Sequence, residues 1–580
     1  MTTASRHSRA DGNPEKLITD NIDIWTSAIK TKSAAGRGSR NKLDLYGIKK
    51  LRELILNLAV RGLLVPQDPN DEPASVLLEK IAQEKAKLLK AGKIKKQKPL
   101  SEIGEGEKPL GLPKTWCWQR VTDVFYPISV SKNKVKTSEI QEKGKVPVVD
   151  QGQSYVAGYV DLENLEIKLP GPVIVFGDHT SALKYIDFNF IAGADGVKIL
   201  RPICCSEQYF YLVSQTLSIE NRGYGRHYSR LIDNFFPLPP LKEQHRIVTK
   251  VDELMALCDQ LEQQQSSSLN AHQTLVQTLL GALTTVSERE GFTAAWSRIA
   301  AHFDTLFTTE NSIDQLKQTI LQLAVMGKLV PQDPNDEPAS LLLEKIVQEK
   351  SKLIKAGKIK KQKALPEIGE NEKPFDFPVG WEWCKLDDVS LHSEAGWSPR
   401  CEPTPREGLK WGVLKVSAVT WGKFNPNENK ELPSDLDPRP EYEVKANDFL
   451  ISRANTAQLV AKAVIVPADV PACLMMSDKI IRFVFSESVF GDYISLFNNA
   501  EVARNYYARV AGGTSSSMKN VSREQIRNLV LSLPPLAEQH RIVTKVNELM
   551  TLCDTLKARL NSAQTTQLQL ADSLAEQAVG

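Results

Sequence analysis

The sequence predicts an α+β fold in which two α/β domains are separated by long antiparallel helices of the coiled-coil type, with pseudo-two-fold internal symmetry. Three observations lead to this prediction. Two stretches recur almost unchanged half a chain apart, and these stretches carry a helical apolar periodicity. The segments between them differ from one another and are rich in short β-type runs bounded by Gly and Pro.

The length and composition are those of a multidomain globular protein. The chain has 580 residues, of which 41% are hydrophobic and 25% are charged, so it is too long for one core and too apolar to be disordered. The formal net charge of +3 neither demands nor excludes nucleic acid as a partner. Whether nucleic acid is a partner must therefore be judged from the local distribution of charge.

The cysteines and the apolar runs indicate the compartment. The eight cysteines form no Cys-x-x-Cys pair and have no His at zinc-ligand spacing, so we expect neither a disulfide framework nor a zinc site. The polar N-terminus lacks the apolar centre of a signal peptide, and no run approaches the roughly 18 apolar residues of a membrane span. We therefore expect a cytoplasmic protein that does not contact a membrane.

The internal repeat has two blocks. Residues 51–98 match 316–363 without a gap, and both copies contain VPQDPNDEPAS verbatim. Residues 239–261 match 534–556 at all but four positions. A solenoid would repeat every 20 to 50 residues, whereas this period is half the chain. The pattern therefore predicts two halves that share a frame and carry different inserts.

The second repeated block predicts long helices. Apolar residues are spaced four and three apart from Ile247 to Leu261 and again from Ile542 to Leu560, which is an a/d seam. The Pro-Pro-Leu entry suits a helix start, where a missing N–H costs nothing. A single helix over 241–285 would be about 65 Å long. The apolar stripe of the first block offers it a packing partner, although each stripe taken alone also fits an ordinary core.

Two basic runs end the copies of the first block. EKAKLLKAGKIKKQK (84–98) and EKSKLIKAGKIKKQK (349–363) each carry seven lysines and one acidic residue. One interpretation is a solvated linker face. The other is contact with nucleic-acid phosphates, with one run beside each insert.

The first insert holds side chains of the types that read base edges. Short β-type runs with Gly and Pro between them predict a compact sheet with projecting loops. Adjacent residues on a strand point to opposite faces, so Asp178 and His179 are not expected to form a catalytic dyad. Arginine, glutamine and histidine present donors and acceptors to DNA bases, and glycines in NRGYGRHYSR (221–230) allow close backbone approach. The candidates here are Gln151, Gln153, His179, Thr180, Arg222, Tyr224, Arg226 and His227.

The second insert offers a different set at matching places. AGGTSSSMKN (511–520) stands where NRGYGRHYSR stands in the first half, shortly before the Pro-Pro-Leu motif. The candidates here are Lys415, Arg453, Asn455, Thr456, Ser515, Ser516 and Lys519. Hydroxyl side chains contact phosphates at least as often as bases.

Catalytic signatures are missing from the sequence. There is no G-x-x-x-x-G-K-[ST] loop for ATP phosphates, no N-P-P-[YF] motif of adenine methyltransferases, and no convincing P-D…[DE]-x-K nuclease arrangement. We therefore expect no catalytic residue, no bound metal and no cofactor in this chain.

The repeats resemble a known family. LPPLAEQHRIVTKVNELM, GWEWCKLDDV and ILQLAVMGKLV look like the conserved regions of type I restriction-modification specificity subunits, and the extended N-terminus resembles the longer subfamily. The resemblance covers nearly the whole chain. It implies a DNA-reading subunit for phage defence in which each insert is a target-recognition domain for one half of a split, asymmetric site.

The resemblance also implies partners. The expected ones are double-stranded DNA, two modification (methyltransferase) subunits and two restriction (translocase and nuclease) subunits in the bacterial cytoplasm. S-adenosylmethionine, ATP and Mg2+ are expected on those subunits, and the complex is expected to be an adenine-N6 methyltransferase and an ATP-dependent endonuclease. The residues expected to bind partners on the helices are Leu254, Leu261, Leu549 and Leu556.

Eight segments follow from the pattern. We expect an N-terminal helical extension (1–50), a first proximal helical region (51–113), a first target-recognition domain (114–238), a first long helix (239–285), a connector (286–315), a second proximal region (316–378), a second target-recognition domain (379–533) and a second long helix (534–580). Two alternatives stay open. One is a coiled-coil scaffold without DNA readout, and the other is a self-sufficient methylating or cleaving enzyme.

Overall fold

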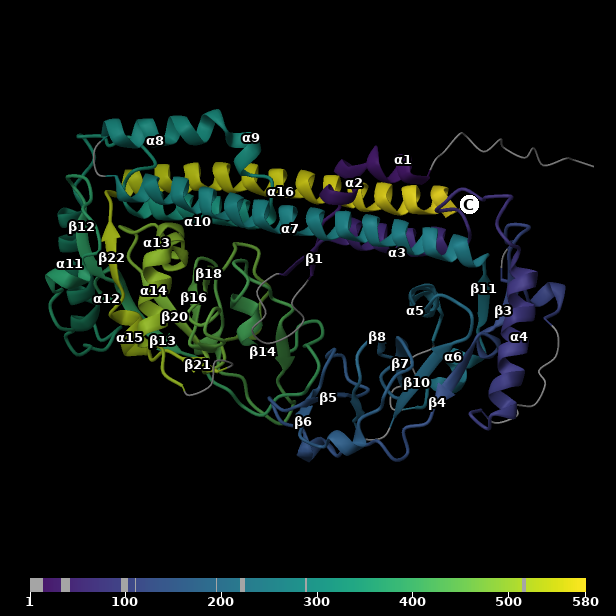
Figure 1. The fold of residues 1–580 in the computed structure, drawn as a ribbon. Coiled ribbons are helices and arrows are strands. Elements are labelled where there is room, and N and C mark those ends of the chain that lie inside the picture. Colours follow the sequence, from purple (N-terminus) through teal and green to yellow (C-terminus); the bar gives the residue numbers. More distant parts are fainter. Residues whose placement is uncertain are drawn as a thin grey trace, which may run out of the picture. The chain divides into compact units, whose positions relative to one another are not determined.

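A computed structural model describes residues 14–32, 42–94, 103–109, 111–193, 196–219, 225–286, 289–513 and 518–579. The chain divides into two compact units. Unit 1 contains the described residues up to 268 together with those from 563 onward, and unit 2 contains residues 269–562. Figure 1 labels most of the helices and strands used below.

Unit 1 contains a bundle of three helical segments. They are α3 (Tyr46–Val60), the first part of α7 (Leu241–Thr285) and the last part of α16 (Leu536–Val579). Arg52 on α3 bonds Asp259 and Glu262 on α7 at 2.7 and 2.9 Å. At its two ends, α3 contacts α16 through Tyr46 Oη to Asp572 Oδ1 at 2.7 Å, and through Arg61 to the Val579 carbonyl at 2.9 Å. The helix α3 therefore runs antiparallel to α7 and parallel to the end of α16.

Unit 2 repeats this bundle with the long helices exchanged. Here α10 (Glu310–Val325) packs with the last part of α7 and the first part of α16. Lys557 on α16 bonds Asp314 on α10 at 3.0 Å, and the Lys328 amino group reaches the Val286 carbonyl after α7 at 2.7 Å. Each long helix therefore supplies its first part to one bundle and its last part to the other.

The prediction of an N-terminal helical extension needs correction. Residues 14–50 are not simply helical, because the helices α1 (Pro14–Thr19) and α2 (Ile22–Ser27) are followed by the antiparallel pair β1 (Lys30–Lys32) and β2 (Lys42–Asp44). The predicted boundary at residue 50 also falls inside α3. It was placed where the match between the two repeated blocks begins, and the start of a sequence match does not mark the start of a helix. The connector 286–315 is largely helical, with α8 (Arg289–Ala301), α9 (Phe303–Leu306) and the start of α10.

The leucines assigned to partner binding face the interior of their own units. Leu254 and Leu261 are only 4% and 8% exposed in the core formed with α3. Leu549 and Leu556 pack against the core that contains α10. Packing within the chain buries Leu254 and Leu261, so their assignment to partner binding is wrong. Leu549 and Leu556 are only half-buried, and their assignment to partner binding stays a prediction.

The verbatim block VPQDPNDEPAS ties the start of each long helix to its unit. In unit 1, Arg246 bonds Asp71 at 2.6 Å and Gln67 donates to the Glu243 carboxylate at 2.5 Å. In unit 2, Arg541 bonds Asp336 at 2.5 Å. The copies then continue into α4 (Ala74–Lys90) and α11 (Ala339–Lys355). The identical sequences thus make matching ion pairs.

A buried glutamine joins each long helix to the insert domain beside it. In unit 1, Gln244 Oε1 accepts from the Ser206 amide at 2.8 Å, and its Nε2 donates to the Pro239 carbonyl at 3.0 Å. In unit 2, Gln539 Oε1 accepts from the Phe490 amide at 2.8 Å, and its Nε2 donates to the Pro534 carbonyl at 2.9 Å. Both glutamine side chains are fully buried. The orientation of each insert domain on its helix start is therefore set by the same four hydrogen-bonding groups.

The first insert domain (residues 117–238) contains three sheets. Their strand orders are β4-β10-β7-β8, β6-β5-β9 and β11-β3, and among the described strands β5 and β9 pair in parallel while the others pair antiparallel. The strands are β3 (Cys117–Arg120), β4 (Phe125–Ile128), β5 (Val146–Val149), β6 (Gly158–Val160), β7 (Val173–Gly177), β8 (Leu183–Ile186), β9 (Ile191–Ala192), β10 (Val197–Pro202) and β11 (Phe235–Leu238), with helices α5 (Glu207–Thr216) and α6 (Tyr228–Ile232).

The second insert domain (residues 382–533) has the same topology. The orders β13-β20-β16-β18, β15-β14-β19 and β12-β22 match those of the first domain, and among the strands described here β14 and β19 form the parallel pair. An additional two-stranded ladder joins β17 and β21.

Its elements are β12 (Glu382–Lys385), α12 (Leu386–Val389), β13 (Ser390–Ala395), β14 (Gly412–Leu414), β15 (Asn429–Glu431), β16 (Phe449–Ser452), β17 (Ala454–Asn455), β18 (Ala463–Ile465), β19 (Leu474–Met475), β20 (Ile480–Phe485), α13 (Gly491–Asn499), α14 (Glu501–Val510), β21 (Lys519–Asn520), α15 (Arg523–Arg527) and β22 (Val530–Leu533). Two inserts with little sequence resemblance therefore fold in the same way. Within the described part of the chain, no helix has the length and apolar character needed to cross a membrane.

Replacing Gln539 by Ala should open the junction between α16 and the second insert domain. The change leaves the Phe490 amide and the Pro534 carbonyl buried without partners, at a cost of about 1–3 kcal/mol for each unpaired group. Hydrogen exchange followed by mass spectrometry should show faster exchange of the Phe490 amide. Glu548→Ala is the control, because the contact found for Glu548 within the described part of the chain is an exposed ion pair with Lys545 on the same helix. Unchanged exchange at Phe490 would contradict the junction.

Candidate nucleic-acid interface

The candidate residues gather at one set of loops in each insert domain. In the first domain, residues 150–153 follow β5, residues 178–182 join β7 to β8, and residues 225–227 precede α6. We name these three segments the first loop face. In the second domain the matching segments are 415–421 after β14, 453–462 between β16 and β18, and 518–522 before α15, and they form the second loop face.

Backbone contacts bring the segments of the first loop face together. The His179 amide donates to Gln151 Oε1 at 3.2 Å, and Thr180 Oγ1 donates to the Gln151 carbonyl. The His227 amide donates to the Asp178 carbonyl at 2.7 Å. The amide of Tyr228 donates to the Asp178 carboxylate at 2.9 Å. Asp178 therefore joins the β7 loop to the start of α6.

Several candidates in the first domain have structural partners. His227 is only 2% exposed and its Nδ1 lies 3.1 Å from the Asp178 carbonyl, so the prediction that it reads a base is wrong. The Gln151 amide oxygen and the Thr180 hydroxyl hold the loops to one another. Arg226 and Gln153 are exposed, and His179 is half-buried. Arg222 and Tyr224 lie outside the described residues.

A basic hollow opens on the first loop face. A cavity of about 520 Å³ is lined by Lys134, His179, Lys198 and Arg226, with the buried Asp178 also in its wall. Lys198 lies 3.6 Å from the Asp178 carboxylate and 5.4 Å from the centre of the Tyr228 ring. Lys134, Lys198 and Arg226 carry three positive charges and Asp178 carries one negative charge, so the net charge of these four side chains is positive. Such a surface attracts the phosphates of a nucleic acid.

The second loop face is joined in a similar manner. Asn455 Nδ2 donates to Thr420 Oγ1 at 3.2 Å, which links the β16 loop to the β14 loop. Asn455 also pairs with Lys519 across the β17–β21 ladder, and the Val521 amide donates to the Arg453 carbonyl at 2.9 Å. The structure therefore brings the candidates Arg453, Asn455 and Lys519 together. The candidates Ser515 and Ser516 lie outside the described residues.

Two polar atoms on the second loop face are buried without a partner. Arg453 Nε and Thr456 Oγ1 make no hydrogen bond to any described residue. Buried polar groups are normally paired, because an unpaired group costs about 1–3 kcal/mol. Arg453 Nε and Thr456 Oγ1 are therefore two unpaired polar atoms in the interior of the second loop face.

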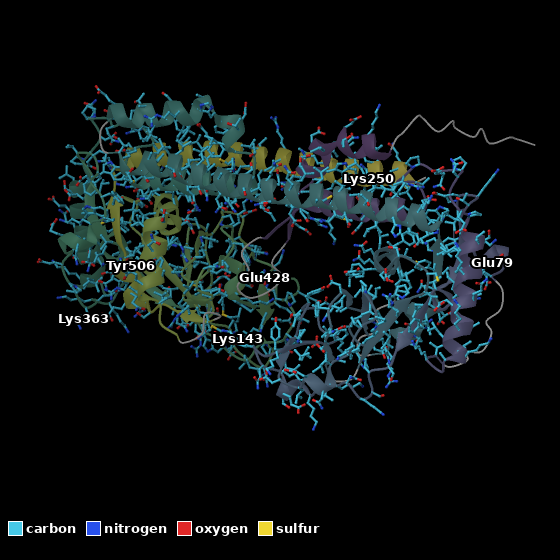
Figure 2. All side chains as sticks on the ribbon, in the orientation of Figure 1. Glu79, Lys143, Lys250, Lys363, Glu428 and Tyr506 are labelled. Atoms are coloured by element: carbon cyan, nitrogen blue, oxygen red, sulfur yellow. The ribbon has the colours of Figure 1, made fainter. Side chains whose placement is uncertain are left out.

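Lys415 is engaged within its own domain. Its amino group lies 3.5 Å from the Glu428 carboxylate, and the Ser417 hydroxyl donates to the same carboxylate at 2.5 Å. Figure 2 labels Glu428. The Ser417 hydrogen bond and the Lys415 charge lower the pKa of Glu428, so its carboxylate stays ionised beside the lysine. Lys415 is consequently a weaker DNA candidate than its sequence position indicated.

Matching strained residues lie in the two central loops. Ser181 and Ala461 each precede the next strand by two residues, and both have a φ of 56°. The Ser181 amide donates to the Gly177 carbonyl at 2.8 Å, and the Ala461 amide donates to the Ser452 carbonyl at 2.9 Å. A left-handed conformation costs a non-glycine residue about 1–3 kcal/mol and is retained where the surroundings enforce it. Both domains therefore place a left-handed residue two positions before the next strand, although the closing hydrogen bond spans four residues in the first loop and nine in the second.

Arg504 and Lys462 support the second loop face from behind. Arg504 donates to the Val460 carbonyl at 2.6 Å and to the Ala461 carbonyl at 3.1 Å. The Lys462 amino group donates to Asn499 Oδ1 at 3.2 Å. Burial, together with the nearby Arg504 charge, lowers the pKa of Lys462 to about 8.

The basic runs have a partly structural role. Lys85 Nζ donates to the Thr122 carbonyl at 2.9 Å, and the equivalent Lys350 donates to the Asp387 carbonyl at 3.1 Å. Burial lowers the pKa of Lys85. One lysine of each run therefore holds the adjacent insert domain to α4 or α11. Residues 95–98 of the first run lie outside the described residues.

Sequence reasoning missed three residues on these faces. Lys134 and Lys198 are separated from the candidate motifs in sequence, and only the fold of the sheet brings them to the hollow. Trp421, the last residue of the 415–421 segment of the second loop face, is 71% exposed. The sequence signal for Trp421 was its turn, Thr-Trp-Gly-Lys, which joins an aromatic residue to a glycine and a cation.

Two domains of one topology, each with a polar and basic loop face and each set on a duplicated helical frame, define a two-domain DNA-specificity protein. The family model described as the type I restriction modification DNA specificity domain matches residues 113–271 and 378–564. The chain therefore belongs to the family of type I restriction-modification specificity subunits. Within the described residues, no group of three or more His, Cys, Asp or Glu side chains is placed to hold a metal ion.

Individual relatives match over almost their whole length. The type I restriction enzyme EcoEI specificity subunit of Escherichia coli is 46% identical, with 97% of this chain and 99% of that protein covered. The EcoAI specificity subunit of Escherichia coli is 42% identical with the same coverage. The solved HsdS subunit from Thermoanaerobacter tengcongensis is 15% identical, covering 81% of this chain and 98% of that chain, with a TM-score of 0.36.

Replacing Lys462 by Met should stabilise the protein near neutral pH. Because the pKa of this lysine is about 8 in the folded protein and 10.5 for an ordinary lysine of the unfolded chain, the unfolded chain binds more protons between these values. The stability of the wild type therefore rises with pH across this window as the cost of the buried charge disappears. The thermal midpoint of Lys462→Met should exceed that of the wild type at pH 7, and the gap should narrow as the pH rises toward the upper pKa. A gap independent of pH would contradict this assignment.

Proposed function

We propose that this chain is the sequence-specific DNA-recognition subunit of a type I restriction-modification complex. It reads a bipartite, asymmetric site with one insert domain on each half-site. The observation that carries the proposal is that two domains of identical strand order present different side chains at matching loops. A shared topology supplies the same docking geometry to both domains, while unlike loops select unlike bases.

The side chains of the loop faces have two different roles in DNA binding. Arg226, Lys134 and Lys198 in the basic hollow take backbone phosphates, which set register without reading sequence. Polar side chains that are at least partly exposed, such as Gln153 in the first domain and Arg453 and Asn455 in the second, are available to base edges. In this division of roles, the phosphate contacts contribute mainly to affinity and the base contacts contribute sequence specificity.

The chemistry belongs to other chains in this proposal. Two modification subunits bind the duplicated helical frame and methylate adenine N6 in both half-sites with S-adenosylmethionine. Two restriction subunits join them and couple ATP and Mg2+ to translocation and cleavage. The present chain contributes no catalytic residue, and the complex works in the bacterial cytoplasm, where the DNA is.

Mapping methylated adenines tests the function. The chain is co-expressed with modification subunits of the same system, and the methylated positions in plasmid DNA are determined. The proposal requires one split motif with a constant spacer. Methylation at unrelated sequences would favour the scaffold alternative, and methylation by the purified chain with S-adenosylmethionine alone would favour the self-sufficient enzyme.

Exchange of the first insert should change one half of the motif. Residues 119–236 are replaced by the corresponding insert of another family member, and methylation mapping should show one new half-site and one unchanged half-site. The reason is that each insert domain has its own core and its own loop face. A change in both half-sites would refute independent reading.

Replacing Arg226 by Gln should reduce the salt dependence of DNA binding. If Arg226 neutralises one phosphate, the slope of log K against log salt should become shallower by about 0.9, with equal losses for specific and unrelated duplexes. Lys145→Gln is the matched control, because Lys145 precedes β5, on the side away from the loop face, and pairs with Glu163 at 2.9 Å. An unchanged slope with relaxed sequence preference would instead make Arg226 a base reader.

A further inference from the structure

The turn from Thr420 to Phe424 presents an exposed indole at the edge of the second loop face. Trp421 is 71% exposed, whereas Thr420 before it is 3% exposed. Among the described residues, no ring contact or hydrogen bond to the Trp421 side chain is found. A side chain of this size buries a large apolar area when it binds a partner.

The turn that carries Trp421 is anchored on both sides. Thr420 Oγ1 donates to the Val416 carbonyl at 2.7 Å and accepts from Asn455 at 3.2 Å. Phe424 packs against the core that contains Ala418 and Val419. The backbone of Trp421 is therefore held in place, and a ligand that uses this side chain pays little entropy to order the turn.

The surroundings of Trp421 indicate which partner it meets. Lys423 is exposed in the same turn, and Asn455, which bonds Thr420, lies across the ladder from Lys519. The adjoining loop contains the unpaired buried atoms Arg453 Nε and Thr456 Oγ1. A single exposed aromatic ring among cations and polar side chains suits a polyanion with stacked rings better than an apolar protein surface.

The first domain lacks an equivalent free ring among its described residues. Tyr155 in the loop after β5 is 51% exposed, but its hydroxyl donates to the Tyr185 carbonyl at 2.7 Å. Its ring also packs edge-on against Phe188, with 5.8 Å between the ring centres. Tyr155 is thus tied to its own domain, whereas Trp421 is not. The two loop faces therefore differ in their capacity to engage a base ring.

We propose that the Trp421 indole packs against a base pair of the half-site read by the second insert domain, entering the groove as a wedge at a base step. The inference rests on the proposed function. A wedge of this kind partly unstacks one step, which is cheapest at flexible pyrimidine-purine steps. The second domain then gains sequence specificity from the deformability of the DNA as well as from hydrogen bonds to the bases.

The test uses the assembled complex and a duplex built from the methylated motif. Trp421→Ala should weaken binding by about 10-fold or more, and Trp421→Phe, which keeps a ring, should restore most of the affinity. Leu409→Ala is the matched control, because Leu409 is 84% exposed and precedes β14, whereas Trp421 follows it. Leu409→Ala should bind as the wild type does, and the thermal midpoints of the variants should be equal.

Duplexes with one scrambled half-site locate the contact. The insert exchange identifies which half-site belongs to the second domain. Scrambling that half should abolish the difference between Trp421→Ala and the wild type, whereas scrambling the other half should preserve it. 2-Aminopurine placed in the second half-site should brighten with the wild-type complex and not with Trp421→Ala.

Each outcome separates the inference from the proposed function. If the wild-type complex binds its motif and Trp421→Ala binds equally well, the wedge is wrong while DNA recognition stands. If Trp421→Ala loses affinity equally on duplexes with either half scrambled, the indole makes no contact specific to that half-site and the inference also fails. If the wild-type complex shows no preference for the motif, the proposed function itself fails.

Discussion

The structure depends on a buried glutamine in the first turn of each long helix. Gln244 and Gln539 each use both ends of the side-chain amide. The nitrogen donates to a carbonyl of the Pro-Pro entry, and the oxygen accepts from the backbone N–H of the residue just before α5 or α13. Both side chains are fully buried, so neither set of hydrogen bonds can be replaced by water without opening the core. The insert domain and the helix start consequently behave as one rigid piece in each unit.

The adjoining carboxylates extend this junction. Glu538 accepts from the Trp381 indole at 3.0 Å, and burial raises the pKa of both Glu538 and Glu243. The ion pairs of Arg246 and Arg541 lie at the partly exposed edge of the same contact. The repeated sequence thus supplies a network of glutamine, carboxylate and arginine side chains whose members are hydrogen-bonding or ionic partners of one another. The loop faces contribute no side chain to this junction, so their sequences can differ between the two domains.

Sequence patterns were most informative where they reported periodicity. The predicted helix over 241–285 coincides with α7, because an a/d seam of this length has no alternative that buries it. The same pattern could not say what covers the seam, and the assignment of Leu254 and Leu261 to partners was wrong. Residue type was also a poor guide to orientation. His227 and Lys415 belong to base-reading or phosphate-binding types, yet a carbonyl and a carboxylate of their own domains occupy them.

The sequence by itself determined the duplicated frame, the two unlike inserts and the long helices, because repeats and apolar spacing are visible without a fold. Only the tertiary structure decided that the unlike inserts share one topology and that residues such as Lys134, Lys198 and Arg226 line one hollow. The physical reason is that strand pairing joins residues distant in sequence through backbone hydrogen bonds, which many different side chains permit. The loops carried on those strands therefore acquire their neighbours, and their recognition chemistry, only when the sheets form.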